Sequence, residues 1–213
     1  MSARRLPEAT VARLPVYLRV LAEVADETIS SDDLASGAGV NAAQVRKDLS
    51  HLGSYGTRGV GYDVAYLVRQ ISRQLGLSED RRVAIVGVGN LGHALAGYGG
   101  FVERGFRIVA AFDVDPRTVG QRVGGVLIEP LERLADVVSE KGVEMALLTT
   151  PATAAQAAAD AVVAAGVNSI LNFAPARVEA PAGVAVRQVD LGVELQILSY
   201  YGTQAAGVTS QAG

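Results

Sequence analysis

The sequence predicts an α/β protein in which an N-terminal winged-helix domain precedes a Rossmann-like parallel-sheet domain. A buried strand runs into Gly87-Val88-Gly89-Asn90-Leu91-Gly92, a motif typical of the phosphate-binding turn of a Rossmann unit. Strand and helix patterns alternate after this motif, which indicates a parallel sheet covered on both faces. Helical periodicity dominates the segment before it. We therefore expect four parts, namely a first domain at 1–80, a second at 81–190, a C-terminal helix at 191–202 and a flexible tail at 203–213.

Composition narrows the class of protein. The chain has 213 residues, 49% of them hydrophobic, which is enough for packed cores. No apolar run approaches the roughly 20 residues of a membrane span, and no apolar segment follows the basic N-terminus as in a secretory signal. With no cysteine and two histidines, disulfides are excluded and a metal site is not expected. These features predict a soluble cytoplasmic protein without membrane or metal. The net charge of −3 means that any nucleic-acid interface depends on local charge.

The first two helices are expected within residues 8–38. Over residues 8–25 apolar side chains recur at spacings of three and four, which predicts one buried face: Val11, Leu14, Leu18 and Leu21. Because proline cannot donate a backbone hydrogen bond, the regular part of this helix is expected to begin close to Pro15. Ser31 is the expected N-cap of a second short helix, which Gly37 and Gly39 should end.

A third helix is expected over residues 42–52 and carries the strongest nucleic-acid signal. Asn41 is its expected N-cap, and Gln44 stands where a reciprocal capping bond can form. An apolar face should contact the core through Val45, Leu49 and Leu52. The opposite face is small, hydroxylic and cationic, as in a helix that lies in a DNA major groove. Its members are Ala43, Arg46, Lys47 and Ser50, with Gln44 and His51 at the margin.

The segment that follows predicts a wing. Residues 53–62 contain four glycines and one cation, Arg58, which suits a hairpin tip that approaches a phosphate backbone and reaches the minor groove. The alternative is a solvated helix face followed by a mobile linker. Together the helix and the loop favour a winged helix, and residues 64–77 should add one more amphipathic helix. The candidate DNA contacts of the wing are Ser54, Tyr55, Gly56, Arg58 and Gly59.

The second domain is expected to bind a dinucleotide. Strands are expected at 83–87, 107–113, 145–150, 168–173 and 184–189, with a short one near 126–128. Gly87 permits the tight turn, Gly89 lets a pyrophosphate approach, and Gly92 lets the helix pack on the strand. The backbone N–H groups of Asn90 and Leu91 open that helix toward an anion. Val88 lies between the first two glycines of the same turn.

Asp113 ends the second strand 21 residues after Gly92 (113 − 92), where an acid binds adenosine ribose hydroxyls and repels a 2′-phosphate. It therefore favours NAD and NADH over NADP, although nearby Arg117 makes a phosphorylated ribose conceivable. Further ligand contacts are expected at the carboxyl ends of two later strands, where each segment could equally begin a plain loop. They are Thr150, Pro151, Asn172 and Phe173.

Catalytic groups are not expected. Hydride transfer needs a general acid or base, but His93 directly follows the glycine motif and Lys141 lies in a polar stretch. Binding without chemistry is the favoured interpretation. The alternatives are an NAD-dependent oxidoreductase or a CoA-binding protein, each with an N-terminal assembly domain. The C-terminal helix is apolar nearly all round, so it should be buried on its own sheet or in a partner subunit.

Four blocks of the sequence resemble the Rex redox-sensing transcriptional repressors of Gram-positive bacteria, namely residues 44–50, 53–62, 87–92 and 171–175. The resemblance runs from about residue 5 to residue 202. It implies a homodimer with exchanged C-terminal helices, which represses palindromic operator DNA while NADH is scarce and leaves it when NADH binds. It also implies that Tyr98 contacts the cofactor and moves with its state. Arg13 and Asp190 correspond to a pair that links the DNA-binding domain of one subunit to the cofactor domain of the other.

Overall fold

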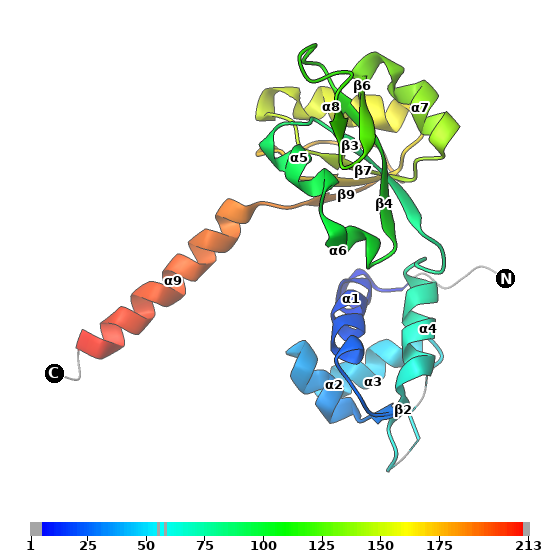
Figure 1. The fold of residues 1–213 in the computed structure, drawn as a ribbon. Helices are drawn as coiled ribbons and strands as arrows, with labels where there is room; N and C mark the ends of the chain where they lie inside the picture. The colour runs from blue at the N-terminus through cyan, green and yellow to red at the C-terminus, as the bar shows by residue number, and fades with distance from the viewer. Residues whose placement is uncertain (1–5, 55, 58, 211–213) are drawn as a thin grey trace. The chain divides into compact units, whose positions relative to one another are not determined.

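The computed structural model describes residues 6–54, 56–57 and 59–210, and the chain divides between Glu79 and Asp80 into two compact units (Figure 1). The first unit contains four helices among the described residues: α1 (Glu8–Ala22), α2 (Ser31–Ala38), α3 (Ala42–His51) and α4 (Val64–Gln74). Strands β1 (Thr28–Ile29) and β2 (Tyr62–Asp63) pair antiparallel, and a bridge between Thr57 and Gly61 closes the loop after α3. This is the winged-helix order that the sequence predicts.

One apolar core holds the first unit together. The fully buried side chains come from the helices at helical spacing, and they include Leu14, Tyr17, Leu34, Val45, Leu49, Leu67 and Ile71. Leu18 and Leu52 pack against this core while partly exposed. Val11 is 40% exposed, so the prediction that it faces the core was wrong. Thr10 occupies that turn of the buried face instead.

Pro15 lies inside α1, and the prediction that the helix begins close to it was wrong. Pro15 is exposed, and so is Val11, whose carbonyl a residue at position 15 would normally bond. Water can therefore satisfy the freed carbonyl, and the ring does not disturb the core. The buried Leu14 and Tyr17 on either side provide packing that keeps the helix continuous.

The N-caps of α2 and α3 are the residue types that the sequence predicts, but the α2 cap stands one residue earlier than expected. Ser30, one residue before the expected Ser31, caps α2 by accepting from the Asp33 N–H at 3.0 Å. Gly37 lies inside α2, so the prediction that it ends this helix was wrong, whereas Gly39 is the left-handed C-cap as expected. Glycine at position 37 lets α1 approach closely, since a Cβ there would meet Val20 at 2.7 Å. The Asn41 cap of α3 is confirmed, since its Oδ1 accepts from the Gln44 N–H at 2.8 Å.

The second unit is a seven-stranded sheet in the order β5-β6-β4-β3-β7-β8-β9, parallel except for the β5-β6 hairpin. Leaving out β5, this is the doubly wound order of a Rossmann fold. The hairpin is an addition that the sequence analysis missed, although Gly124-Gly125 is a typical two-residue turn signal. The strands are β3 (Arg81–Val86), β4 (Phe106–Asp113), β5 (Arg122–Val123), β6 (Val126–Pro130), β7 (Met145–Leu148), β8 (Ser169–Asn172) and β9 (Ala185–Gln188).

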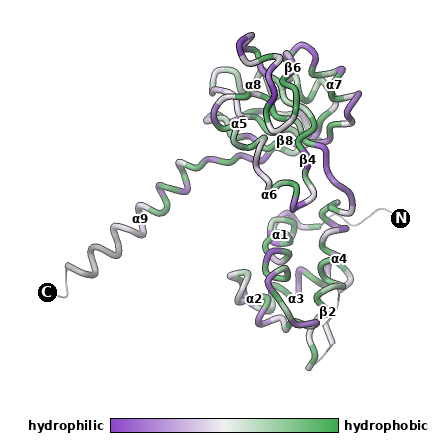
Figure 2. Tube along the Cα trace, viewed as in Figure 1, coloured by the Kyte–Doolittle hydropathy of each residue, from purple (hydrophilic) through white to green (hydrophobic). Residues whose placement is uncertain are grey.

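Helices cover both faces of this sheet. On one face Val86, Phe112 and Leu148 pack against α7 (Leu134–Lys141) and α8 (Ala152–Ala164). On the other face Ile85 and Leu147 pack with side chains of α5 (Asn90–Ala96) and α6 (Gly99–Val102). A 3-10 turn, η1 (Leu131–Arg133), leads into α7. The central strands β3, β4 and β7 therefore carry apolar residues on both faces, and hydrophobic stretches of the sheet can be followed along the chain in Figure 2.

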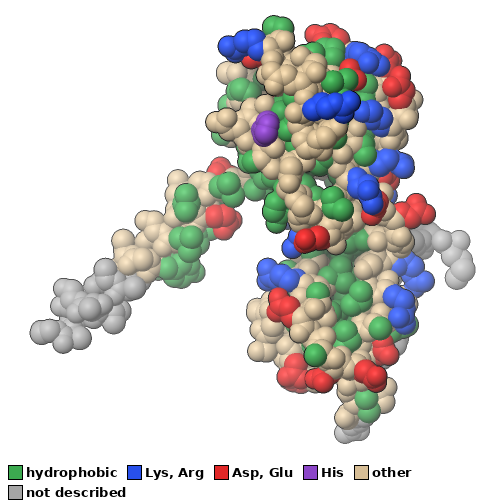
Figure 3. Space-filling model, viewed as in Figure 1, with side chains coloured by type: hydrophobic (Ala, Val, Ile, Leu, Met, Phe, Trp, Pro, Cys, Tyr) green, Lys and Arg blue, Asp and Glu red, His purple; other side chains and the backbone are tan. Residues whose placement is uncertain are grey.

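The C-terminal helix α9 (Leu191–Ser210) extends beyond residue 202, where the sequence predicted its end. Residues 211–213 lie outside the described part of the chain. Large apolar side chains are exposed along α9, and Figure 3 shows them at the surface. They are Leu191, Val193, Leu195, Ile197, Leu198, Tyr200 and Tyr201. In the range that the structure describes, none of the helices is both long and apolar enough to span a membrane.

Candidate nucleotide pocket and nucleic-acid interface

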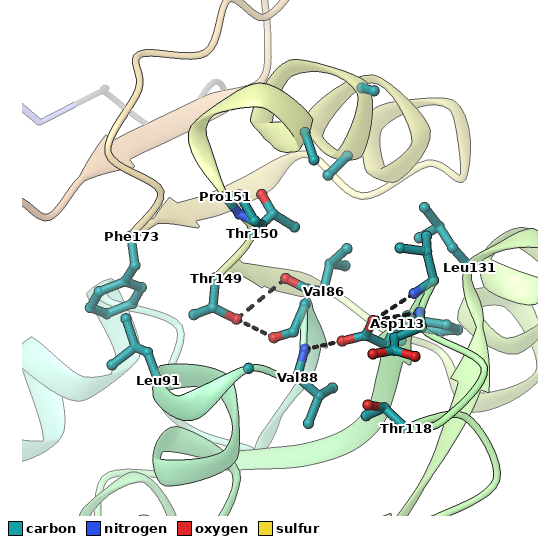
Figure 4. Close-up of a pocket in the computed structure, with 18 of the residues that line it drawn as sticks. Val86, Val88, Leu91, Asp113, Thr118, Leu131, Thr149, Thr150, Pro151 and Phe173 are labelled. Atoms are coloured by element: carbon teal, nitrogen blue, oxygen red, sulfur yellow. Dashed lines mark hydrogen bonds between the residues drawn. The ribbon is translucent and has the colours of Figure 1, made fainter.

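A pocket of about 690 Å³ opens at the carboxyl ends of β3, β4 and β7 (Figure 4). This edge is where the strand order reverses between β3 and β7, and in open α/β sheets ligands bind there. Eight of the predicted cofactor residues line it: Gly87, Val88, Gly89, Leu91, Asp113, Thr150, Pro151 and Phe173. Other lining residues, including Thr118, Leu131 and Ala154, were not predicted from the sequence.

The glycine turn shows a distinct reason for each glycine. Gly87 has φ +92°, a left-handed conformation that favours glycine. A Cβ at Gly92 would lie 2.1 Å from the Gly87 carbonyl oxygen, so any side chain there would push α5 away from the strand. A Cβ at Gly89 would meet nothing within 4 Å. The space beside Gly89 is thus open to a ligand, while Gly92 lies beneath the turn.

The same turn presents backbone N–H groups to the pocket. Gly89 is the N-cap of α5 and supplies no side-chain acceptor to the first N–H groups of that helix. The helix therefore begins with donors that an anion can satisfy. Thr149 at the end of β7 holds the turn by donating to the Gly87 carbonyl oxygen at 2.5 Å. The geometry fits the pyrophosphate of a dinucleotide.

Asp113 stands beside this turn, and its carboxylate accepts from three backbone N–H groups. Oδ2 accepts from Val88 at 2.6 Å, and Oδ1 accepts from Val114 at 2.7 Å and Asp115 at 2.9 Å. Because a carboxylate has about four acceptor positions, one remains on Oδ2 for a ribose hydroxyl. A carboxylate cannot donate to a phosphate, so this position suits an unmodified ribose.

Thr150 and Phe173 lie on the other side of the turn from Asp113, and Figure 4 places the Phe173 ring near Leu91. The Thr150 Oγ1 is buried and has no hydrogen-bond partner among the described residues. An unpartnered buried hydroxyl costs free energy unless a ligand or water satisfies it. The pocket therefore has a carboxylate at one end, donors in the middle, and a hydroxyl with apolar walls at the other end.

Three of the predicted cofactor residues besides Gly92 do not line the pocket. Asn172 is fully buried, and its side chain bonds to Ala176, Gln188 and Ala174, so it fixes the β8 end. Its contact with a cofactor stays a prediction. Asn90 is exposed at the start of α5. Tyr98 is 53% exposed, and its ring packs edge-to-face against that of Phe101 with 5.1 Å between the ring centroids.

The exposed face of α3 carries the side chains predicted to contact DNA. Ala43, Arg46, Lys47 and Ser50 are all exposed. The Arg46 guanidinium donates to the Ser31 Oγ at 2.9 Å, and the Ser50 Oγ donates to the Lys47 carbonyl at 2.7 Å. Two cations at consecutive positions, Arg46 and Lys47, therefore lie at the surface of the third helix, where a winged-helix protein presents its recognition residues.

The wing residues divide into two sets. Gly56 and Gly59 are exposed, whereas Tyr55 and Arg58 lie outside the described residues. Ser54 is only 2% exposed, so the prediction that its side chain contacts DNA is not supported by its position. Its Oγ is buried without a partner in the described part of the chain, as is the Nε2 of His51.

Helix α3 itself carries a buried carboxylate, Asp48, which was not predicted from the sequence. Asp48 is 0% exposed. It accepts from Thr10 Oγ1 at 2.9 Å, Arg13 Nε at 2.6 Å, Tyr17 Oη at 2.7 Å and Gln44 Nε2 at 3.0 Å. Gln44 is thus occupied on the inner side of α3, and the expected capping bond from its side chain does not form. We call Asp48 and these four partners the Asp48 cluster.

Burial of Asp48 by itself raises its pKa, but the hydrogen bonds that it accepts outweigh burial and lower the pKa to about 2. The same burial and the bond to Asp48 raise the pKa of Tyr17. The carboxylate is therefore ionised near neutral pH and joins α1 to α3 through charged and neutral donors. One sequence signal was available: Asp48 follows Val45 by three residues and precedes Leu49, which places it at the edge of the apolar face.

Arg13 and Asp190 both have partners within their own units. Arg13 bonds to Asp48 through Nε and Nη2, at 2.6 and 2.8 Å. The Asp190 Oδ1 accepts from the backbone of Gly192 and Val193 and so caps the start of α9. Their pairing between subunits stays a prediction. The described residues contain no cluster of histidine and acidic side chains that could hold a metal ion.

Comparisons with known proteins cover both units. A family described as "Putative DNA-binding protein N-terminus" matches residues 5–50, and one described as "CoA binding domain" matches residues 78–176. The redox-sensing transcriptional repressor Rex of Streptomyces griseus is 56% identical over 213 residues, covering 99% of this chain and 84% of that protein.

Two solved structures of RSP, a Rex-family repressor, are also similar along nearly the whole chain. The complex with β-NAD+ and operator DNA has a TM-score of 0.88 at 33% identity and covers 98% of both chains. The complex with β-NADH has a TM-score of 0.84 at 32% identity and covers 96% of this chain and 98% of that chain.

Proposed function

Because this chain belongs to the Rex family of redox-sensing transcriptional repressors, we propose that it binds operator DNA and leaves it when NADH binds. The observation that carries the proposal is the likeness of the whole chain to the RSP complex with β-NAD+ and operator DNA. A dinucleotide pocket and a cationic recognition helix, each on its own unit, provide the two binding surfaces that such a sensor requires.

In the pocket, we assign the middle of the dinucleotide to the glycine turn. The pyrophosphate would bind the backbone at Gly89 and the first turn of α5, and Asp113 would accept from the adenosine ribose. The nicotinamide end then lies toward Leu91, Thr150 and Phe173, where the free Thr150 hydroxyl can bond its carboxamide. NADH and NAD are the cofactors; reversible hydride exchange is the chemistry that they supply in enzymes.

We propose that this chain uses the pocket for sensing alone and has no enzymatic activity. The ionisable residues that line it are Asp113 and Asp115, both at the adenosine end. Lys141 donates to the Val109 carbonyl at 2.9 Å, and His93 is exposed on α5 without lining the pocket. Among the residues that the structure describes, the proposed nicotinamide end thus lacks a general acid or base, which hydride transfer to a carbonyl substrate would need. As a transcriptional repressor, the protein would work in the cytoplasm.

The DNA-binding surface is assigned to α3 and the wing. Ala43, Arg46, Lys47 and Ser50 would face the major groove, and Gly56 and Gly59 would let the wing backbone approach phosphate. Tyr55 and Arg58 are proposed wing contacts on sequence grounds. A two-fold dimer would place two such helices on the half-sites of a palindromic operator.

A homodimer with exchanged C-terminal helices would cover the exposed apolar side chains of α9. A helix that is apolar nearly all round is stable in water only when a partner covers it. Sedimentation equilibrium is therefore expected to give twice the 22.1 kDa of one chain.

Coenzyme A is a second candidate ligand, favoured by the CoA-binding family match at residues 78–176. It shares the adenosine and pyrophosphate groups of NADH but carries a phosphorylated ribose. Competition of CoA against bound NADH separates the two: NADH should remain bound at a large excess of CoA.

The function is tested by selecting a palindromic duplex from random DNA with the full chain and measuring band shifts. NADH should release the duplex, and the G89A variant should keep it bound at the same NADH concentration. Operator binding that is indifferent to NADH would contradict the proposal, and turnover of NADH with a small carbonyl substrate would favour an oxidoreductase.

A further inference from the structure

A second carboxylate, Asp115, lies at the adenosine end of the pocket. The turn after β4 brings Asp113, Val114, Asp115 and Thr118 into the pocket wall. Arg117 belongs to the same turn, between two of these lining residues, and its side chain is 89% exposed. An arginine at this end of a Rossmann pocket is the group that normally accommodates a ribose 2′-phosphate.

The Asp115 carboxylate binds both the guanidinium and the backbone N–H of Arg117. The Asp115 Oδ2 accepts from Arg117 Nη2 at 2.7 Å and from Nε at 3.2 Å, and Oδ1 accepts from Nε at 3.1 Å. Oδ1 also accepts from the Arg117 backbone N–H at 2.9 Å, which ties the turn to the same carboxylate. The guanidinium beside Asp115 lowers the pKa of that carboxyl to about 2, so the pair is ionised at neutral pH.

We infer that Asp115 is a second determinant of nucleotide selectivity, which keeps NADPH out by holding Arg117 away from the ribose 2′-phosphate. The inference rests on the proposed function, because it concerns the adenosine end of the same pocket. Asp113 would accept hydrogen bonds from the ribose hydroxyls directly. Asp115 instead binds Arg117, the cation that would otherwise favour NADPH over NADH.

The charges explain why the pair selects against a phosphate. A 2′-phosphate brings a charge of about −1.5 to −2 and needs a cationic partner. To reach it, Arg117 would have to leave Asp115, and the freed carboxylate would then face the phosphate in the same turn. NADPH is thus disfavoured in two ways: its phosphate gains no ion pair while Arg117 stays bound to Asp115, and a freed Asp115 would repel it. Specificity commonly combines a missing attraction with a repulsion in this way. An unphosphorylated ribose meets neither cost.

The test compares NADH and NADPH on the full chain by nucleotide fluorescence, using D115N, R117A and D115N/R117A. Asparagine keeps the Oδ1 acceptor for the Arg117 backbone N–H, while it removes the charge and replaces the Oδ2 acceptor of the Arg117 side chain with an NH2 donor. We expect D115N to bind NADPH about tenfold more tightly while its NADH affinity changes by less than about twofold. R117A should leave both affinities near those of the unchanged chain, and D115N/R117A should lose most of the NADPH gain.

An unchanged NADPH affinity in D115N, or a gain of equal size in D115N/R117A, would overturn the inference. D115S is the second variant if D115N unfolds, since serine also caps this turn. High salt should reduce the D115N effect, because exposed charges are screened. If the unchanged chain binds NADH but NADH does not release operator DNA, the proposed function fails while this inference is still decided by the titrations. An unchanged chain that binds neither nucleotide overturns both.

Discussion

The recognition helix α3 and the glycine turn before α5 are both proposed to face phosphate, but they offer it different groups. On α3 the groups are the exposed side-chain cations Arg46 and Lys47. In the glycine turn they are backbone N–H groups, which reach a ligand only because Gly89 and Gly92 have no side chains. DNA binding by α3 should therefore weaken by degrees as single cations are removed. Nucleotide binding by the glycine turn should be lost when a single Cβ is added.

The two surfaces also differ in what supports them. A buried charge on α3 itself supports this helix, because Asp48 joins it to α1 through the Asp48 cluster. The glycine turn instead rests on an apolar sheet, and polar support comes from Thr149 and Asp113 at its rim. Each difference leads to a test that affects one unit and spares the other.

The largest effect is expected for Asp48→Asn. Removing the charge leaves Arg13 and Tyr17 without their ionised acceptor, which should lower the free energy of unfolding of the first unit by about 3 kcal/mol. Operator binding should weaken because α3 loses its anchor, while NADH binding should be unchanged. Urea denaturation with D32N as an exposed control measures this, and equal stability of the two variants would show that the Asp48 cluster contributes nothing.

The same carboxylate predicts a pH dependence. Its pKa is about 2 in the folded chain against 3.8 as the ordinary value. A lowered pKa means that the stabilisation is fully present above pH 3.8 and is lost as the pH falls toward about 2. Urea denaturation of the first unit between about pH 5 and about pH 2 should therefore show a decline that D48N reduces. A decline of the same size in D48N would assign it to other carboxylates.

The glycine turn is tested by a matched pair, G92A and G89A. In G92A the new Cβ collides with the Gly87 carbonyl, so both stability and NADH affinity should fall, the latter by about 100-fold or more. G89A should fold normally, because its Cβ meets nothing, yet it should lose NADH to a similar extent. Both variants should keep operator binding in band shifts. Unimpaired NADH binding by G89A would remove Gly89 from the site.

The stepwise response of α3 is tested with R46A and K47A. Each should weaken operator binding about tenfold and reduce the salt dependence by about one released counterion, because each removes one phosphate contact. NADH affinity should not change. R133A, on the second unit, is the matched control. If either single variant lost operator binding altogether, the replaced side chain would support the structure of the first unit and would not simply contact a phosphate.

The smallest effect is expected at the start of α3. Asn41→Ala removes the acceptor for the Gln44 N–H and should lower the stability of the first unit by about 1 kcal/mol. Operator affinity should fall less than in K47A. Thermal melting checks it, with N41S as the variant that restores the cap.

The sequence predicted the features that depend on local spacing. The glycine turn, the place of Asp113, the Asn41 cap and the alternation of strands and helices all follow from such patterns. Long-range features escaped it: Pro15 is tolerated because its side of α1 faces water, and Asn172 is fixed by Gln188 from the neighbouring strand. Asp48 looks like one more surface acid until Thr10, Arg13 and Tyr17 from another helix reach it. Such partners depend on tertiary packing, which spacing alone does not show.

The central claim is that one chain couples the pocket to the DNA surface. It is tested most directly by titrating the preformed operator complex with NADH at a fixed concentration of NAD. The account predicts that the complex dissociates as NADH saturates the pocket, and that G89A stays bound throughout. An operator affinity that does not change while NADH demonstrably binds would contradict it.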